Sequence, residues 1–260
     1  MTRIIVTGIS GRMGSRIADI IRETPGLTLA GAVEAPGSFA VGTLLPEGQQ
    51  VVDDLSKNIM HADVVIDFTS PRATLHHAEI AAKHDKALVV GTTGFNPEER
   101  GQLVDRLARI PAVFSSNMSI GMNVMFKVAA DTARLLGEDY DIEIFEAHHR
   151  HKKDAPSGTA LSLAEEIAKS VGRDLAKVAK YERYGQVGER PAREIGIQTI
   201  RGGDIIGDHT VYFAGSGERV EITHRATSRD NFARGAVLAA KWVSDKSPGI
   251  YTMADVLGLK

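Results

Sequence analysis

A cluster of proton donors and cations lies in the segment EAHHRHKKDAPSGTA, residues 146–160. Three histidines, one arginine and two lysines occupy the consecutive positions 148–153. The Pro-Ser-Gly-Thr sequence that follows predicts the start of a helix, where unpaired N–H groups and the helix dipole attract anions. These residue types favour a reaction that needs a proton near neutral pH and a substrate with carboxylates. The alternative is a solvated basic loop, the commonest role of a charge run.

A glycine-rich loop near the first residue indicates dinucleotide binding. In the segment RIIVTGISGRMG an apolar strand precedes Gly8, Gly11 and Gly14, and an amphipathic helix follows. In this context backbone N–H groups bind a pyrophosphate, although G-x-x-G-x-x-G differs from the common G-x-G-x-x-G spacing. A second strand, LTLAGAV over residues 27–33, is followed by Glu34, which lies 20 residues after Gly14. A carboxylate at this distance accepts hydrogen bonds from ribose hydroxyls.

The elements that would position these residues alternate between strand and helix up to about residue 117. This order predicts an α/β fold with a Rossmann-like parallel sheet, helices on both faces and a ligand at the carboxyl ends of the strands. The predicted elements here are strands over 63–70, 86–94 and 111–117 and helices over 71–85 and 96–109.

The pattern changes after a predicted helix over 120–136, because the later strands alternate apolar and polar residues. This alternation predicts an α+β region with a mixed, mainly antiparallel sheet and the 157–170 helix on one side. The predicted strands are 141–149, 194–203, 207–215 and 218–227, with a tight turn over 215–218. Helix resumes from 230 through 242, and a short helix is expected within 251–257.

Composition excludes several classes of protein. The net charge of −2 argues against a nucleic-acid-binding protein, whose domain is normally basic. The absence of cysteine excludes disulfides, thiolate metal sites and the thiol nucleophile of a phosphorylating semialdehyde dehydrogenase. There is no basic-plus-apolar leader, and no apolar run approaches ~18 residues. We therefore expect a cytoplasmic protein that does not act on a membrane.

Six motifs together resemble the 4-hydroxy-tetrahydrodipicolinate reductase (dihydrodipicolinate reductase) family. They span nearly the whole chain in the family's order, and EAHHRHK and DAPSGTA are far more specific than the glycine loop. The resemblance implies that NAD(P)H reduces 4-hydroxy-tetrahydrodipicolinate, a cyclic dicarboxylate, to tetrahydrodipicolinate in lysine and diaminopimelate synthesis. The motifs are GISGRMG (8–14), VVIDFTSP (64–71), VVGTTGF (89–95), SSNMSIGMNVM (115–125), EAHHRHKKDAPSGTA (146–160) and RATSRDNFARGA (225–236).

The resemblance also implies roles for single residues. His148 is the proton donor or acceptor, and Lys152 is a second general acid that also pairs with a substrate carboxylate. His149, Gly158 and Thr159 contact the substrate, and no metal takes part. The cofactor-binding residues that it implies are Gly8, Ile9, Ser10, Gly11, Arg12, Met13, Glu34, Gly91, Thr92, Thr93, Ser115, Ser116, Asn117 and Met118, with Thr93 between nicotinamide and substrate.

The resemblance further implies a dinucleotide-binding domain of residues 1–119 and 229–260, and a substrate-binding and tetramerisation domain of residues 120–228. Family members are tetramers assembled through the second sheet, so we expect a homotetramer. No sequence rule decides which face of that sheet is covered. The apolar side chains that are candidates for either face are Ile195, Ile197, Val211 and Phe213.

Cofactor choice depends on the residues near the ribose. Glu34 favours NADH, because its charge repels the 2′-phosphate of NADPH. Family members that accept NADPH well often have a basic residue after this acid, and here that residue is Ala35. Arg12 in the glycine loop can partly replace it by a bidentate contact. We therefore expect both cofactors to work, with NADH preferred.

Several residues have a simpler expected role. Arg150, His151 and Lys153 are expected to be solvated or structural, since so charged a loop has surplus charge. A metal site of histidines and Asp154 has suitable ligand types, but neighbouring histidines diverge along a strand. The remaining expectations are that His76 and His77 are surface residues and that Met118, Met122 and Met125 pack in cores, with Met118 also a candidate cofactor contact.

Two other functions are open alternatives. The chain could be another two-domain NAD(P)-dependent dehydrogenase, acting on homoserine, inositol or a sugar, but such enzymes lack the HHRHK segment. It could also be a regulator that binds NAD(H) without turnover, but a regulator has no use for proton donors beside an anion-binding helix start.

Overall fold

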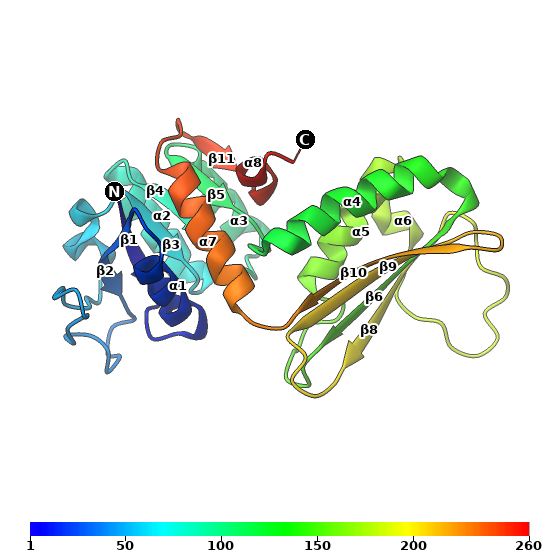
Figure 1. Cartoon of the computed structure of the whole chain (residues 1–260), viewed down its shortest axis with the longest axis horizontal. Helices are drawn as coiled ribbons and strands as arrows, with labels where there is room; N and C mark the ends of the chain where they lie inside the picture. Colours follow the sequence, from blue (N-terminus) through cyan, green and yellow to red (C-terminus); the bar gives the residue numbers. More distant parts are fainter. Residues whose placement is uncertain (260) are drawn as a thin grey trace. The chain divides into compact units, whose positions relative to one another are not determined.

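The computed structural model describes residues 1–259, which form two compact units (Figure 1). Unit 1 is Met1–Ile120 together with Arg229–Lys260, and unit 2 is Gly121–Ser228. Unit 2 is therefore inserted between two segments of unit 1. Within residues 1–259 no helix has the length and apolar character needed to cross a membrane.

Unit 1 is built on a parallel sheet of six strands over the described residues, in the order β11-β5-β4-β3-β1-β2. Each neighbouring pair is parallel. The strands are β1 (Thr2–Thr7), β2 (Leu27–Val33), β3 (Val64–Asp67), β4 (Ala87–Val90), β5 (Pro111–Phe114) and β11 (Gly249–Tyr251). The helices are α1 (Arg12–Glu23), α2 (Pro71–Lys83), α3 (Pro97–Leu107), α7 (Asp230–Val243) and α8 (Met253–Leu257), with short 3-10 helices η1 (Leu55–Lys57) and η2 (Ile59–His61).

Alternation along the strands gives unit 1 a separate core on each face of its sheet. Ile4 and Val6 of β1 pack on the face covered by α1 and α7. Ile5 points to the opposite face, where it packs with side chains of α2 and α3. The two helical layers can be followed on the two sides of the sheet in Figure 1. This confirms the predicted Rossmann-like layer order.

The strand order sets where unit 1 can bind a ligand. From β1 the chain first adds β2 on one side of β1 and then adds β3 on the opposite side. The direction of the strand order therefore switches between β1 and β3. In open α/β sheets ligands bind at the carboxyl ends of the strands beside such a switch. The loops that follow β1, β3 and β4 form this edge, which we call the nucleotide edge.

Unit 2 contains the sheet β10-β9-β6-β8-β7. The predicted mixed, mainly antiparallel pairing is confirmed among the described strands: β9 pairs antiparallel with β6 and β10 over most of the paired length, whereas β6–β8 and the short β8–β7 are parallel. The β6–β8 pair is parallel because helix α5 carries the chain across between these two strands. The elements are α4 (Ile120–Leu136), η3 (Gly137–Asp139), β6 (Asp141–His148), α5 (Gly158–Ser170), α6 (Leu175–Val178), β7 (Ala179–Lys180), β8 (Ile195–Arg201), β9 (Gly207–Ala214) and β10 (Arg219–Ala226).

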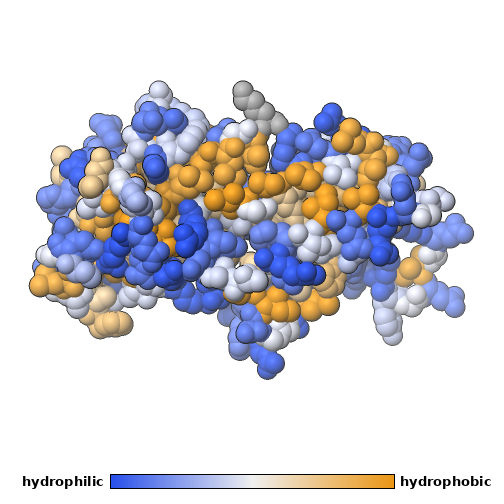
Figure 2. All heavy atoms as spheres, in the orientation of Figure 1, coloured by the Kyte–Doolittle hydropathy of each residue, from blue (hydrophilic) through white to orange (hydrophobic). Residues whose placement is uncertain are grey.

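One face of this second sheet packs on α4 and α5. Met122 and Met125 of α4 lie in this core, which confirms their expected packing role. The exposed side of α4 carries Val128 and Leu135, and apolar surface over this helix is visible in Figure 2. The four side chains whose face the sequence left open all point to the helical side and are fully buried: Ile195, Ile197, Val211 and Phe213.

The ends of several elements differ from their predicted positions. The predicted strand over 63–70 ends at Asp67, since the residues after it form the loop of the nucleotide edge. Strand β11, only Gly249–Tyr251, was not expected because three residues carry no periodicity. The tight turn over 215–218 is confirmed, because the Gly215 N–H donates to the Glu218 carbonyl at 3.0 Å.

Candidate active site

The glycine loop between β1 and α1 has a geometry that only glycines permit. Gly8 has φ +68°, a conformation that other residues rarely adopt. A Cβ on Gly14 would lie 2.0 Å from the Gly8 carbonyl oxygen. Helix α1 begins after Gly11, which has no side chain to cap the first N–H groups of the helix. The start of α1 therefore presents its first backbone N–H groups without a side-chain cap, and this geometry fits a pyrophosphate.

Glu34 follows β2 and lies against this loop. Its carboxylate accepts from the Ser10 N–H at 2.8 Å, from the Ser10 hydroxyl and from the Ala35 N–H at 2.9 Å. Partial burial raises the pKa of Glu34, but the hydrogen bonds from Ser10 and Ala35 lower it more, so the net shift is downward. An ionised carboxylate beside the glycine loop is suited to accept from ribose hydroxyls. Arg12, at the start of α1, is exposed.

The other predicted cofactor residues lie after β4 and β5. Gly91 makes room for the Phe68 ring, because a Cβ there would lie 2.1 Å from the ring. Thr92 is buried and Thr93 is exposed. After β5 the Ser115 hydroxyl donates to the Asn117 carbonyl at 2.9 Å. Ser116 is exposed, whereas the Met118 side chain is buried in the core beneath α7.

The expectation that His76 and His77 are both surface residues is wrong for His77. Its side chain is 10% exposed, and its Nδ1 lies 2.5 Å from a carboxylate oxygen of the fully buried Asp67. His76 does lie at the surface, where Nε2 is 3.1 Å from Asp54. Successive helical positions are separated by about 100°, so one histidine of the pair faces the sheet and the other faces water.

In unit 2 the strand β6 ends at His148, and Glu146 lies two positions before it on the same face. Glu146 is fully buried, and its Oε2 lies 2.6 Å from Nδ1 of His148. The Arg201 guanidinium from β8 donates to both carboxylate oxygens at 2.8 Å. The Thr199 hydroxyl and the Ser157 N–H donate to Oε1 at 3.1 and 3.0 Å.

This arrangement keeps Glu146 ionised. Burial raises the pKa of Glu146, but hydrogen bonds from His148, Arg201 and the Ser157 backbone outweigh it and hold the pKa far below its ordinary range. The pairing of Nδ1 with a carboxylate fixes the ring orientation of His148 and leaves Nε2 to exchange a proton.

The loop after β6 brings Lys152 to the same network. The Lys152 ammonium lies 3.0 Å from the Asp154 carboxylate, and Arg201 donates to the Asp154 carbonyl at 2.7 Å. Lys152 is half-buried, while Lys153 is exposed. Arg201 therefore links the buried Glu146 carboxylate to the Lys152 loop.

Helix α5 begins beside this loop. The Ser157 hydroxyl caps it by accepting from the Ala160 N–H at 3.1 Å, and Gly158 and Thr159 form its first turn. Because the Ser157 N–H is bound to Glu146, the helix start is fixed to the strand that carries His148. His149, the remaining predicted substrate residue, is half-buried just after β6. Arg150 and His151 are exposed, as expected for charge without a buried role.

His209 is a further buried histidine that the sequence analysis did not identify. It pairs with Glu146 across β6 and β9, and its ring stands edge-on to His148 at 5.3 Å between centroids. Burial, with the charge of His148 as a smaller cause, lowers the pKa of His209 to about 3, so its ring is neutral. Glu146 could have been found from its two-residue spacing to His148, but Arg201 and His209 depend on pairing between distant strands.

Across residues 1–259, no three or more His, Cys, Asp or Glu side chains are arranged to hold a metal ion. The rings of His149 and His151 lie 6.2 Å apart between centroids.

Comparison with known proteins identifies the family. Residues 2–118 match the model described as dihydrodipicolinate reductase, N-terminus, and residues 121–257 match dihydrodipicolinate reductase, C-terminus. The chain is 54% identical to 4-hydroxy-tetrahydrodipicolinate reductase of Anaeromyxobacter dehalogenans, over 100% of this chain and 99% of the relative. It is 55% identical to the protein of that name from Syntrophobacter fumaroxidans, over 100% of both chains.

The fold comparison agrees. Dipicolinate-bound dihydrodipicolinate reductase from Paenisporosarcina sp. TG-14 superposes with a TM-score of 0.78 at 23% identity, covering 98% of both chains. A C. glutamicum DAP dehydrogenase is more distant, with a TM-score of 0.56 at 14% identity, covering 100% of this chain and 96% of that one. The chain therefore belongs to the dihydrodipicolinate reductase family.

Proposed function

We propose that this chain reduces 4-hydroxy-tetrahydrodipicolinate to tetrahydrodipicolinate with a nicotinamide nucleotide. Full-length relatives that carry this reductase name support the reaction. The structural observation that carries the proposal is the buried Glu146–His148 pair, which shares Arg201 with the Lys152 loop. A proton-exchanging ring, a cation and a helix start in one unit suit the reduction of a dicarboxylate.

His148 delivers the proton. Glu146 holds Nδ1, so Nε2 is the nitrogen that exchanges a proton with the substrate. The buried carboxylate also stabilises the positive charge of the ring when it carries both protons. The neutral His209 beside it adds no competing positive charge.

Lys152 and the start of α5 hold the substrate carboxylates. The Lys152 side chain is only 23% exposed, and its ammonium group already pairs with the Asp154 carboxylate, which a substrate carboxylate can replace. The first N–H groups of α5, at Gly158 and Thr159, donate hydrogen bonds to a second substrate carboxylate. His149 is a further substrate contact at the end of the same strand.

The nucleotide edge of unit 1 binds the cofactor, which supplies a hydride when bound. The glycine loop takes the pyrophosphate and Glu34 the ribose hydroxyls. The fit is supported by the space that Gly14 leaves and by the ionised Glu34 beside the loop. Thr93 and residues 115–118 flank the nicotinamide. We infer that NADH is preferred over NADPH, because Glu34 repels the 2′-phosphate and Ala35 offers no compensating charge. A lower Michaelis constant for NADPH than for NADH at physiological salt would contradict this inference.

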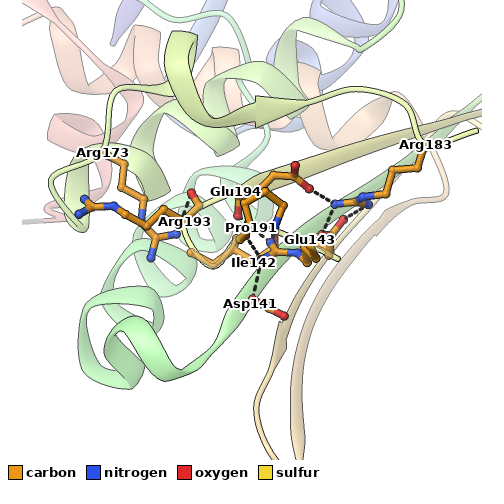
Figure 3. A network of polar contacts seen from close by, with 9 residues as sticks. Asp141, Ile142, Glu143, Arg173, Arg183, Pro191, Arg193 and Glu194 are labelled. Carbon is orange, nitrogen blue, oxygen red and sulfur yellow. Dashed lines mark hydrogen bonds and ion pairs between the residues drawn. The ribbon is translucent and has the colours of Figure 1, made fainter. Parts of the chain in front are cut away.

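Homotetramers form through the face of the unit 2 sheet that α4 and α5 leave uncovered. Phe145 and Ile200 lie on this face, and Ile200 is 46% exposed. Figure 3 shows the polar contacts that fix the segment 181–194 beside it, in which Arg183 donates to Glu143 at 2.7 Å and Arg190 to the same carboxylate at 2.8 Å. A monomeric mass by light scattering at micromolar concentration would exclude this assembly. We place the enzyme in the cytoplasm, where nicotinamide nucleotides are available.

A coupled assay tests the reaction. The substrate is generated in place from pyruvate and aspartate semialdehyde by the upstream synthase, and the absorbance of NADH is followed. We expect a loss of absorbance that requires both the synthase and this protein. A loss of absorbance that needs aspartate semialdehyde but not the synthase, or a reduction of NAD+ when homoserine or a sugar is supplied with it, would assign the chain to another dehydrogenase reaction.

A further inference from the structure

A buried polar network lies directly behind the nucleotide edge, and of its members only Thr92 is among the expected cofactor-binding residues. Asp67, the last residue of β3, is fully buried. One of its carboxylate oxygens accepts from the hydroxyls of Thr69 at 2.8 Å, Thr74 at 2.8 Å and Thr92 at 2.9 Å. The other lies 2.5 Å from Nδ1 of His77.

The partners of Asp67 come from separate segments of unit 1. Thr69 lies in the loop after β3, and Thr92 lies in the loop after β4. Thr74 and His77 belong to α2, and both residues are buried. The Thr69 N–H also donates to the Thr92 hydroxyl at 2.9 Å, so the two loops are bound to each other as well as to Asp67.

The network also reaches the glycine loop. A Cβ on Gly8 would lie 3.0 Å from the methyl carbon of Thr69, so this threonine packs against the turn that precedes α1. The Gly91 N–H donates to the Asp67 carbonyl at 2.9 Å, and Gly91 supports the Phe68 ring. The position of Asp67 therefore affects the loops after β1, β3 and β4.

A buried carboxylate is costly unless each of its oxygens is well paired. Burial raises the pKa of Asp67, but hydrogen bonds from His77 and the threonines lower it more, so the group is ionised. An apolar residue would stabilise this part of the core with less desolvation. The partners of Asp67 lie in the loops at one edge of the sheet. This location points to a role of Asp67 in holding those loops.

We propose that Asp67 and His77 are positioning residues that fix the loops of the nucleotide edge in the shape that binds the nicotinamide nucleotide. Neither residue touches the cofactor in this proposal, and both act through Thr69, Thr92 and Gly91. The inference rests on the proposed dinucleotide site at this edge.

The test uses matched variants of α2 in the full-length protein. Thr74→Val removes the buried hydroxyl at nearly constant shape, and Thr74→Ser retains it. His77→Leu removes the donor to Asp67, whereas His77→Asn retains an N–H near the position of Nδ1. His76→Ala is the control, because His76 is an exposed neighbour on the same helix. The dissociation constant of NADH is measured by its fluorescence, beside the thermal midpoint and the Michaelis constant of the substrate at saturating NADH.

We expect Thr74→Val to weaken NADH binding about tenfold and His77→Leu roughly 10- to 100-fold. Thr74→Ser and His77→Asn should recover most of the affinity, and His76→Ala should bind like the wild type. The Michaelis constant of the substrate should stay unchanged. Wild-type NADH affinity in folded Thr74→Val, with only a lower thermal midpoint, would overturn the proposal and leave a purely structural network. An equal loss of NADH affinity in Thr74→Ser would overturn the proposal too, because the loss would then come from altered packing and not from the missing hydroxyl.

The failure of this inference differs from a failure of the proposed reaction. If wild-type protein binds NADH but does not oxidise it in the coupled assay, the reaction is wrong, while the variant series still decides the role of the network. If His77→Leu does not fold, the two Thr74 variants decide alone.

Discussion

Both units bury a carboxylate against a histidine, and the two pairs differ in how the charge is balanced. Asp67 is paired with His77 and with neutral hydroxyls, so the histidine is needed to hold the carboxylate. Glu146 is also bound by the Arg201 guanidinium, which can balance its charge in every protonation state of His148. His148 can therefore exchange a proton while the buried ion pair between Glu146 and Arg201 is retained. In our two proposals, a similar pair of residues holds loops in one unit and carries chemistry in the other.

The largest effect should come from the histidine that exchanges protons. His148→Gln preserves much of the shape but cannot donate a proton, so we expect kcat to fall roughly 10²–10⁴-fold with little change in the substrate Michaelis constant. Steady-state kinetics in the coupled assay measure both values. Lys153→Ala is the control, since that side chain is exposed. Near-wild-type turnover in His148→Gln with a dead Lys153→Ala would reverse the assigned roles.

Lys152→Ala should damage both kinetic parameters, because it removes an acid and a carboxylate partner together. We expect kcat to fall about 10²-fold and the substrate Michaelis constant to rise about tenfold. The dissociation constant of NADH, measured by fluorescence, should stay within about twofold of the wild type. An effect on NADH binding alone would assign Lys152 to the cofactor site and not to the substrate site.

Glu146→Gln sharpens the comparison between the two carboxylates. Its amide leaves the Arg201 charge unbalanced and weakens the orientation of His148, so we expect kcat to fall roughly 10- to 100-fold.

The same variant has a distinct dependence on pH. The pKa of Glu146 in the folded protein lies below its ordinary value of 4.5, so the stability that it contributes is fully present above that pH. This contribution is lost as the pH falls through 4.5 toward the folded pKa. Thermal midpoints measured at decreasing pH should therefore fall more steeply for the wild type than for Glu146→Gln over this range. Parallel curves would show that the carboxylate is not held in its ionised form.

The smallest expected effect concerns the cofactor phosphate. Ala35→Arg supplies a guanidinium beside the ribose, where it can bind a 2′-phosphate bidentately, so the Michaelis constant for NADPH should fall about tenfold. Ala35→Gln has a long side chain without charge and should leave the preference unchanged. If the arginine variant showed no gain with NADPH, the ribose would lie away from Glu34.

The fold of unit 1 could be predicted because its information is local. The spacing of Gly8 and Gly14, and the carboxylate at Glu34, are read within one strand-loop-helix-strand unit. The network of unit 2 could be predicted only in part. His148 and Lys152 lie in one motif, but Arg201 and His209 meet Glu146 through strands that are more than fifty residues away. The burial of His77 could not be predicted from the sequence, because it depends on which face of the helix meets the sheet.

Transfer of a labelled hydride tests the central claim most directly. The protein is supplied with NADH that carries deuterium at the transferable position of the nicotinamide, together with the synthase, pyruvate and limiting aspartate semialdehyde. The account predicts a tetrahydropyridine dicarboxylate product that contains the deuterium on a ring carbon, with NADH oxidised in equal amount, as measured by mass spectrometry and absorbance. Consumption of NADH without deuterium in that product, or no synthase-dependent product, would contradict it.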